Sequence, residues 1–148
     1  MQTVFLALGS NQGDRLAHFR FALEELAHRG VSIEVKSKIY ASQSVESGGE
    51  GEFLNAVVRA RTELDARQLL SVCLEIESLV GREKPAFEGA KRSGRRALDI
   101  DILMCADEFS NTPELQLPHP RALNRPFVLK PLLDVLESDA VAESGLDW

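Results

Sequence analysis

The sequence predicts an α+β fold in which the elements follow the order βαββαβ. Four short segments have the apolar or alternating pattern of strands, and two longer segments have apolar residues at helical spacing. The order in which these segments occur favours an antiparallel sheet with helices packed on it. Because 148 residues with 44% hydrophobic content suffice for one core, we expect residues 1–148 to form a single domain.

The first two elements are a strand and a helix. Residues 3–8 are apolar and β-prone, and the turn-forming run 9–14 predicts that this strand ends there. In the helix that follows, apolar residues recur at three- and four-residue steps on one face: Leu16, Phe19, Leu23 and Leu26. Gly30 is placed to terminate this helix.

Two further strands flank a glycine-rich loop. Val31, Ile33 and Val35 alternate with polar residues, which predicts a half-buried strand that continues toward Tyr40. Residues 47–51 are too polar and glycine-rich for a regular element. Strand-like character then returns at residues 53–61.

The second half of the chain predicts a helix, a basic loop, a strand and an appended C-terminal segment. Asp65 and Gln68 resemble a capping box at the start of the helix, which we expect to end before Gly81. Its apolar face is Leu69, Val72, Cys73, Ile76 and Val80. A strand follows at 98–102, and the segment 127–136 has a helical pattern. We therefore expect a ferredoxin-like sheet with two helices on one face, and loops, the tail or a ligand on the other.

Charge and cysteine content restrict the class of protein. The net charge of -6 argues against general binding to nucleic acid or to anionic membranes. Cys73 and Cys105 lie in hydrophobic patterns and are expected to be buried thiols in a reducing compartment. Since the N-terminus lacks the pattern of a signal peptide, we expect a cytoplasmic protein.

The segment 82–96 contrasts with this acidic composition, because it carries six basic residues and two acidic ones. One interpretation is a solvated loop, and the other is a loop that binds an anionic ligand of limited size. We expect it to be mobile without ligand and ordered by polyphosphate.

Asp99 and Asp101 are the most informative local feature. Residues two apart on a strand project from the same side, so both carboxylates would point together while Ile100 enters the core. Like charges this close repel unless a cation lies between them, and Mg²⁺ suits a few carboxylates with phosphate oxygens and water. The alternative is a solvent-facing strand with two ordinary surface charges.

Arginines adjoin these carboxylates in the run 92–96, and guanidinium groups beside a metal site suit phosphoryl transfer. No P-loop motif is present, so loop arginines and metal would have to hold the phosphates. His119, between two prolines, could face a phosphate or be an ordinary turn histidine.

Phe53, Asn55 and Phe127 allow two interpretations. They could be core residues with an edge or turn asparagine, or two rings could stack on a flat heterocycle while the amide contacts its edge. Sequence spacing leaves both open.

Taken together, these residues resemble the 6-hydroxymethyl-7,8-dihydropterin pyrophosphokinase family along nearly the whole chain. Five stretches carry the resemblance: 8–14, 53–56, Ile76 and Glu77 with Gly81 and Arg82, 96–103, and 118–121 through 125–129. The resemblance implies transfer of pyrophosphate from ATP to the pterin alcohol in folate biosynthesis, giving AMP and the pterin diphosphate.

The resemblance also implies roles for individual residues. Asp99 and Asp101 would hold two Mg²⁺ ions, while Phe53 and Phe127 would sandwich the pterin and Asn55 would bind its edge. Arg82, Arg92 and Arg96 would belong to a catalytic loop that closes over the triphosphate. Glu77, His119 and Arg125 would complete the nucleotide site. We expect small-molecule substrates, no nucleic acid or membrane partner, and a monomer.

The chain departs from the family pattern in two places. The stretch 42–46 lacks the expected Thr-Pro-Pro run, and Ser93 and Arg95 stand at unusual positions of the basic loop. The alternative function is therefore a pterin- or nucleotide-binding module with weak or lost transferase activity. A nucleotidyltransferase fits less well, because its Gly-Ser and Asp-x-Asp elements should be close in sequence, whereas Gly9 and Asp99 are far apart.

Overall fold

The computed structural model of the protein describes residues 1–43, 52–81, 97–137 and 148. Within that part of the chain, five strands form one antiparallel sheet. They are β1 (Gln2–Ser10), β2 (Val31–Lys36), β3 (Tyr40–Gln43), β4 (Glu52–Thr62) and β5 (Asp99–Cys105). The main order is β2-β4-β1-β5, and β3 also pairs with β4. The predicted ferredoxin-like arrangement is confirmed.

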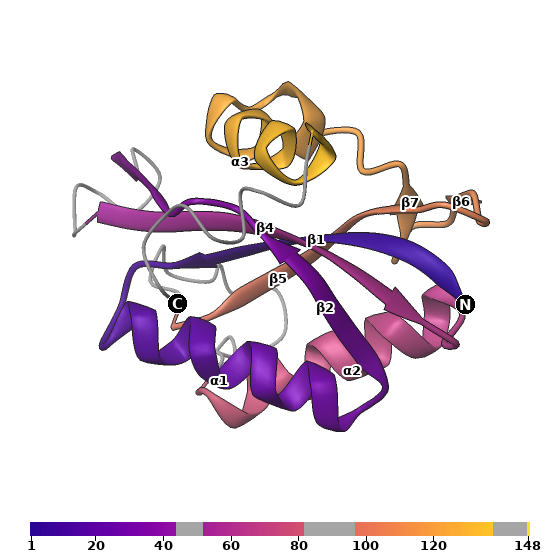
Figure 1. Ribbon diagram of the computed structural model, residues 1–148, viewed down its shortest axis with the longest axis horizontal. Helices are drawn as coiled ribbons and strands as arrows, with labels where there is room; N and C mark the ends of the chain where they lie inside the picture. Colours follow the sequence, from indigo (N-terminus) through magenta and orange to yellow (C-terminus); the bar gives the residue numbers. More distant parts are fainter. Residues whose placement is uncertain (44–51, 82–96, 138–147) are drawn as a thin grey trace.

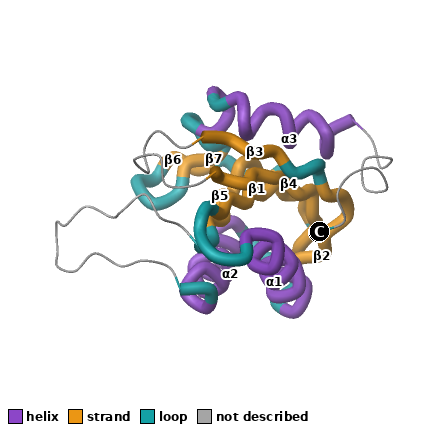
Figure 2. The backbone as a smooth tube through the Cα atoms, turned by 90° about the vertical axis from the view of Figure 1, so that its left-hand side faces the viewer, coloured by secondary structure: helices purple, strands orange, loops and turns teal. Residues whose placement is uncertain are grey.

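Helices cover both faces of this sheet (Figures 1 and 2). On one face lie α1 (Arg15–His28) and α2 (Ala66–Leu79), as predicted. The opposite face carries α3 (Pro126–Glu137), which is the appended C-terminal segment. A short hairpin, β6 (Ser110–Asn111) and β7 (Gln116–Leu117), and the 3-10 turn η1 (Ala122–Asn124) lead from β5 to α3. The described part contains no helix that is long and apolar enough to cross a membrane.

Local sequence signals explain the helix boundaries. Asp65 accepts a hydrogen bond from the backbone of Gln68, whose side chain accepts one in return, so the predicted capping box is present. Gly30 and Gly81 follow the two helices with φ of 90° and 97°, a conformation that other residues rarely adopt.

The segment expected to continue from Val31 toward Tyr40 is instead two strands, interrupted at Ser37. The Ser37 hydroxyl accepts a hydrogen bond from the backbone N–H of Val57 at 2.9 Å. Its carbonyl accepts one from the indole of Trp148 at 2.8 Å. The Val57 N–H and the Ser37 carbonyl are thus bonded to side chains and not to a neighbouring strand. The hydrogen-bond ladder of the sheet therefore stops at Ser37 and restarts at Tyr40.

The two sheet faces have separate hydrophobic clusters. The larger one lies under α1 and α2 and includes Leu6, Leu8, Phe19, Leu69 and Ile76, all at most 2% exposed. The smaller one lies under α3 and includes Val57, Leu103, Val128, Leu132 and Val135. Residues that face each other on neighbouring antiparallel strands share a sheet face, so the strand register assigns each site residue to one of these sides.

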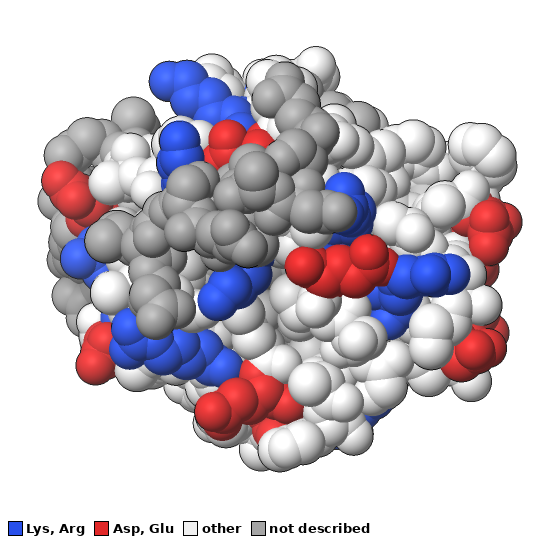
Figure 3. Space-filling model, in the orientation of Figure 1, with Lys and Arg blue, Asp and Glu red and all other residues white. Residues whose placement is uncertain are grey.

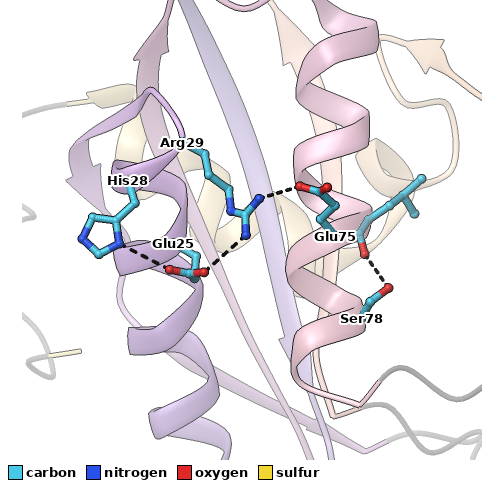
Figure 4. Close-up of polar contacts among 6 residues, drawn as sticks. Glu25, His28, Arg29, Glu75 and Ser78 are labelled. Carbon is cyan, nitrogen blue, oxygen red and sulfur yellow. Dashed lines mark hydrogen bonds and ion pairs between the residues drawn. The ribbon is translucent and has the colours of Figure 1, made fainter.

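An ion-pair group connects α1 to α2 (Figure 4). The guanidinium of Arg29 pairs with Glu25 at 3.4 Å and with Glu75 on the second helix, and His28 contacts Glu25 at 3.3 Å. Partly exposed pairs of this kind contribute about 0–1 kcal/mol each. The buried cluster therefore holds the helices together.

Candidate active site

Two predicted site residues, Asn55 and Asp99, lie in one row across the sheet with Gly9 between them. Gly9 on β1 stands opposite Asn55 on β4 and opposite Asp99 on β5. Asp101 stands two residues further along, opposite Ala7, which packs in the α3-side cluster. Asn55 and both aspartates therefore project from the face that α3 covers.

The two carboxylates have the predicted geometry. Asp99 and Asp101 are half-buried, whereas Ile100 between them is 4% exposed and belongs to the core under α1 and α2. Residues 1–43, 52–81 and 97–137 contain no group of three or more potential metal ligands. Two carboxylates leave most of a coordination shell to water and phosphate oxygens, and this donor set suits Mg²⁺.

Glu77 supports this strand from behind. Its side chain is 4% exposed, and Oε2 accepts a hydrogen bond of 2.8 Å from the backbone N–H of Ile100. The bond runs from the last turn of α2 to the residue between the two aspartates. Glu77 therefore holds the backbone of β5 at Ile100, between the two aspartates.

His119 lies beside the same strand with one ring nitrogen already engaged. Its backbone N–H donates to the carbonyl of Leu103 at 2.9 Å, and Nδ1 accepts a hydrogen bond from the N–H of Ala122 at 3.1 Å. In the neutral ring, the proton is therefore on Nε2. His119 can donate this N–H to an acceptor such as a phosphate oxygen.

The surroundings of His119 favour that neutral form. Partial burial lowers its pKa below 6.5, and the nearby positive charges of Arg125 and Arg121 lower it further. The negative charge of Asp99 acts in the opposite direction, which places it within electrostatic range of the imidazole. The backbone contact with Leu103 thus places the histidine beside the strand that carries the two aspartates.

The aromatic candidates lie on β4 and in the first turn of α3. A Cβ atom on Gly9 would lie 3.9 Å from the Phe53 ring and 3.8 Å from Asn55 Oδ1, so both side chains lie within van der Waals reach of this glycine. Phe127 is the second residue of α3 and is half-buried, and the guanidinium of Arg125 lies 5.7 Å from the centre of its ring. This distance is typical of a cation–π contact.

Several candidates lie outside the described residues. These are Arg82, Arg92 and Arg96, together with Ser93 and Arg95 and the whole basic segment 82–96. The same is true of residues 44–46 in the unusual stretch before the glycine-rich loop.

Sequence reasoning missed two residues of the candidate site, Gly9 and Ser42, and the tyrosine that ties β3 to α3. Gly9 separates the asparagine from the first aspartate, and Ser42 accepts a hydrogen bond from the Asn55 amide at 2.8 Å. Tyr40 donates its hydroxyl to Asp134 of α3 at 2.8 Å, and burial followed by this contact raises its pKa to about 12. The alternation of Tyr40 and Ser42 in a short strand was the available signal.

Known proteins provide an independent comparison. The family model described as 7,8-dihydro-6-hydroxymethylpterin-pyrophosphokinase (HPPK) matches residues 5–137. A 2-amino-4-hydroxy-6-hydroxymethyldihydropteridine pyrophosphokinase from Aquifex aeolicus (strain VF5) is 40% identical over 135 residues, which is 91% of this chain and 81% of that protein. A protein of the same name from Bacillus subtilis (strain 168) is 37% identical over 134 residues, 90% of this chain and 77% of that protein.

Other relatives are much longer. The folate synthesis bifunctional protein of Arabidopsis thaliana is 38% identical over 140 residues, which is 95% of this chain. The chain spans only 28% of that protein and 17% of the folic acid synthesis protein fol1 of Pneumocystis carinii.

Proposed function

Because the chain belongs to the 7,8-dihydro-6-hydroxymethylpterin-pyrophosphokinase family, we propose that it transfers pyrophosphate from ATP to 6-hydroxymethyl-7,8-dihydropterin. The products are AMP and the pterin diphosphate, an intermediate of folate biosynthesis. The hydroxymethyl oxygen loses its proton and forms a bond to the β-phosphorus. The bond between this phosphorus and the oxygen bridging to the α-phosphate breaks, and AMP leaves.

One observation carries this proposal: the row that joins Asn55, Gly9 and Asp99 across three adjacent strands. An amide that can bind a heterocycle lies on one side of the glycine, and a carboxylate that can bind a metal lies on the other. A substrate lying along this row would have its ring at Asn55 and its reacting hydroxyl toward Asp99. Such alignment of the reacting groups lowers the entropic part of the barrier.

The aspartates would hold two Mg²⁺ ions, which supply charge neutralisation at the attacking and leaving oxygens when bound. Asp99 and Asp101 fit this task because both project from one side of a strand whose backbone Glu77 holds. His119 would donate Nε2–H to a phosphate oxygen while remaining neutral. It would therefore orient the nucleotide without competing for the cations.

The remaining candidates are assigned by resemblance and by their surroundings. Phe53 and Phe127 would stack on the pterin, and Arg125, beside the Phe127 ring, would face the phosphates. For Arg82, Arg92 and Arg96 the family resemblance is the support, and we propose that they bind the triphosphate as the transition state develops charge. Glu77 would act on the nucleotide through the strand that it holds.

The test is a product assay with purified protein, ATP, Mg²⁺ and 6-hydroxymethyl-7,8-dihydropterin. We expect AMP and the pterin diphosphate in equal amounts, with no AMP when Mg²⁺ or the pterin is omitted. Release of ADP would indicate a different phosphoryl transfer. Binding of both substrates without AMP release would favour the alternative, a pterin- and nucleotide-binding module.

A further inference from the structure

Strand β3 places Ser42 beside the amide of Asn55. In the β3–β4 register, Ser42 stands opposite Phe53 and Tyr40 stands opposite Asn55. These side chains share one face of the sheet, and Asn55 Nδ2 donates to Ser42 Oγ at 2.8 Å. The distance is that of a well-formed hydrogen bond.

The surroundings of Asn55 favour one orientation of its amide. Nδ2 also faces the backbone carbonyl of Phe53 at 3.5 Å, and a carbonyl can only accept a hydrogen bond. The reversed amide would point its own oxygen at this carbonyl. The NH₂ group therefore belongs on the side of Ser42 and Phe53.

The amide oxygen points the other way. Oδ1 lies 3.8 Å from the position that a Cβ atom on Gly9 would take, so it faces Gly9, which forms the floor of the row between Asn55 and Asp99. Among the residues that the structure describes, no donor is in hydrogen-bond contact with Oδ1. The residue as a whole is only 8% exposed, so a ligand on that floor is what Oδ1 is placed to meet.

From this geometry we propose that Ser42 is a positioning residue, which fixes the Asn55 amide with its oxygen toward the ring site and so selects heterocycles with an amino group at the contacted edge. This inference rests on the proposed function and adds a basis for substrate selectivity. A ring with an amino group at the contacted edge donates to Oδ1. A ring with a carbonyl oxygen there leaves two acceptors facing each other and is disfavoured.

The hydroxyl of Ser42 is the group on which this selection depends. Without it, Nδ2 keeps only the longer contact to Phe53, and the amide can rotate to present NH₂ to the ligand. The strand itself is held independently, because Tyr40 and the backbone N–H of Lys38 both donate to Asp134 on α3. Loss of the serine hydroxyl should therefore leave β3 in place.

The experiment compares two heterocycles in three variants. The substrates are 6-hydroxymethyl-7,8-dihydropterin and its 2-oxo counterpart, 6-hydroxymethyl-7,8-dihydrolumazine, in which a carbonyl oxygen replaces the amino group. In the wild type we expect KM to be lower for the amino compound. Ser42→Ala should reduce this preference about ten-fold, mainly through KM, because one directed hydrogen bond is worth about 1–2 kcal/mol.

Two matched variants separate orientation from stability. Ser42→Thr keeps the hydroxyl and should retain the preference within about two-fold. Tyr40→Phe removes a hydroxyl from the same strand face and should lower thermal stability without changing the preference. An unchanged preference in Ser42→Ala, or an equal loss in Tyr40→Phe, would overturn the proposal.

Calorimetric binding of the same two heterocycles keeps this test independent of turnover. If the wild type binds the amino compound but releases no AMP, the proposed function fails while the role of Ser42 is still measured. If the wild type shows no preference between the two heterocycles in either measurement, the positioning role is wrong.

Discussion

Glu77→Ala should destabilise the protein and impair the reaction together. The substitution removes the acceptor for the Ile100 N–H from a site where the glutamate is 4% exposed. Removing the acceptor of a buried backbone N–H costs about 2–3 kcal/mol. For a domain of this size, that loss lowers Tm by about 6–12 °C.

The assay is urea unfolding followed by the fluorescence of Trp148, which is the only tryptophan in the sequence and is 4% exposed. The matched control is Glu75→Ala on the same helix, whose carboxylate is 64% exposed and pairs with Arg29. That change should cost about 0–1 kcal/mol. Glu77→Gln keeps an acceptor and should fall between the two. If Glu77→Ala cost no more than Glu75→Ala, the strand-holding role would be refuted.

Four further outcomes are expected. Asp101→Asn should lower kcat, measured by AMP release, at least about 100-fold because it removes the charge of a metal ligand. Its Tm, measured by calorimetry, should change little because the substitution also removes the repulsion between the two carboxylates. Asn55→Ala should weaken pterin binding by about 1–3 kcal/mol while ATP affinity changes much less, and equal losses in titration would contradict separate subsites. Folding lowers the pKa of His119, so the unfolded state gains a proton first as the pH falls below 6.5. The free energy of unfolding, measured in urea, should therefore fall in that pH range in the wild type and fall less in His119→Asn. Burial raises the pKa of the Cys105 thiol to about 11 and also raises the pKa of the Cys73 thiol. Both cysteines should therefore react with iodoacetamide at pH 8 only after unfolding, as mass spectrometry would reveal.

The sequence predicted the sheet and its first two helices because those elements carry redundant signals. The capping box at Asp65, the glycines after each helix and the alternation around Ile100 all agree with the final packing. The break at Ser37 was not predictable, because it depends on Trp148, which is 111 residues away in sequence. A long-range side-chain contact leaves no local periodicity.

Residues of the candidate site could be named from the sequence, but their arrangement could not be predicted. The Asp99 and Asp101 pair follows from strand geometry alone. By contrast, the row through Asn55 and Gly9 requires the pairing of three strands, and the Ser42 hydroxyl enters it only because β3 is registered on β4. Register is a tertiary property, so one-dimensional patterns could name these residues without bringing them together.

The division of the interior into two unequal clusters has a consequence for how the protein opens. The site shares the side of the sheet that holds the smaller cluster, and α3, which carries Phe127, is attached through that cluster and a few polar contacts. Units with fewer buried apolar contacts exchange their amide hydrogens through openings that cost less than global unfolding. We therefore expect α3 to detach while the sheet and the two helices beneath it remain folded, which would expose the face of the sheet that carries the candidate site. A substrate that contacts both the sheet and α3 would stabilise the attached state of α3 and so raise the free energy needed to detach it.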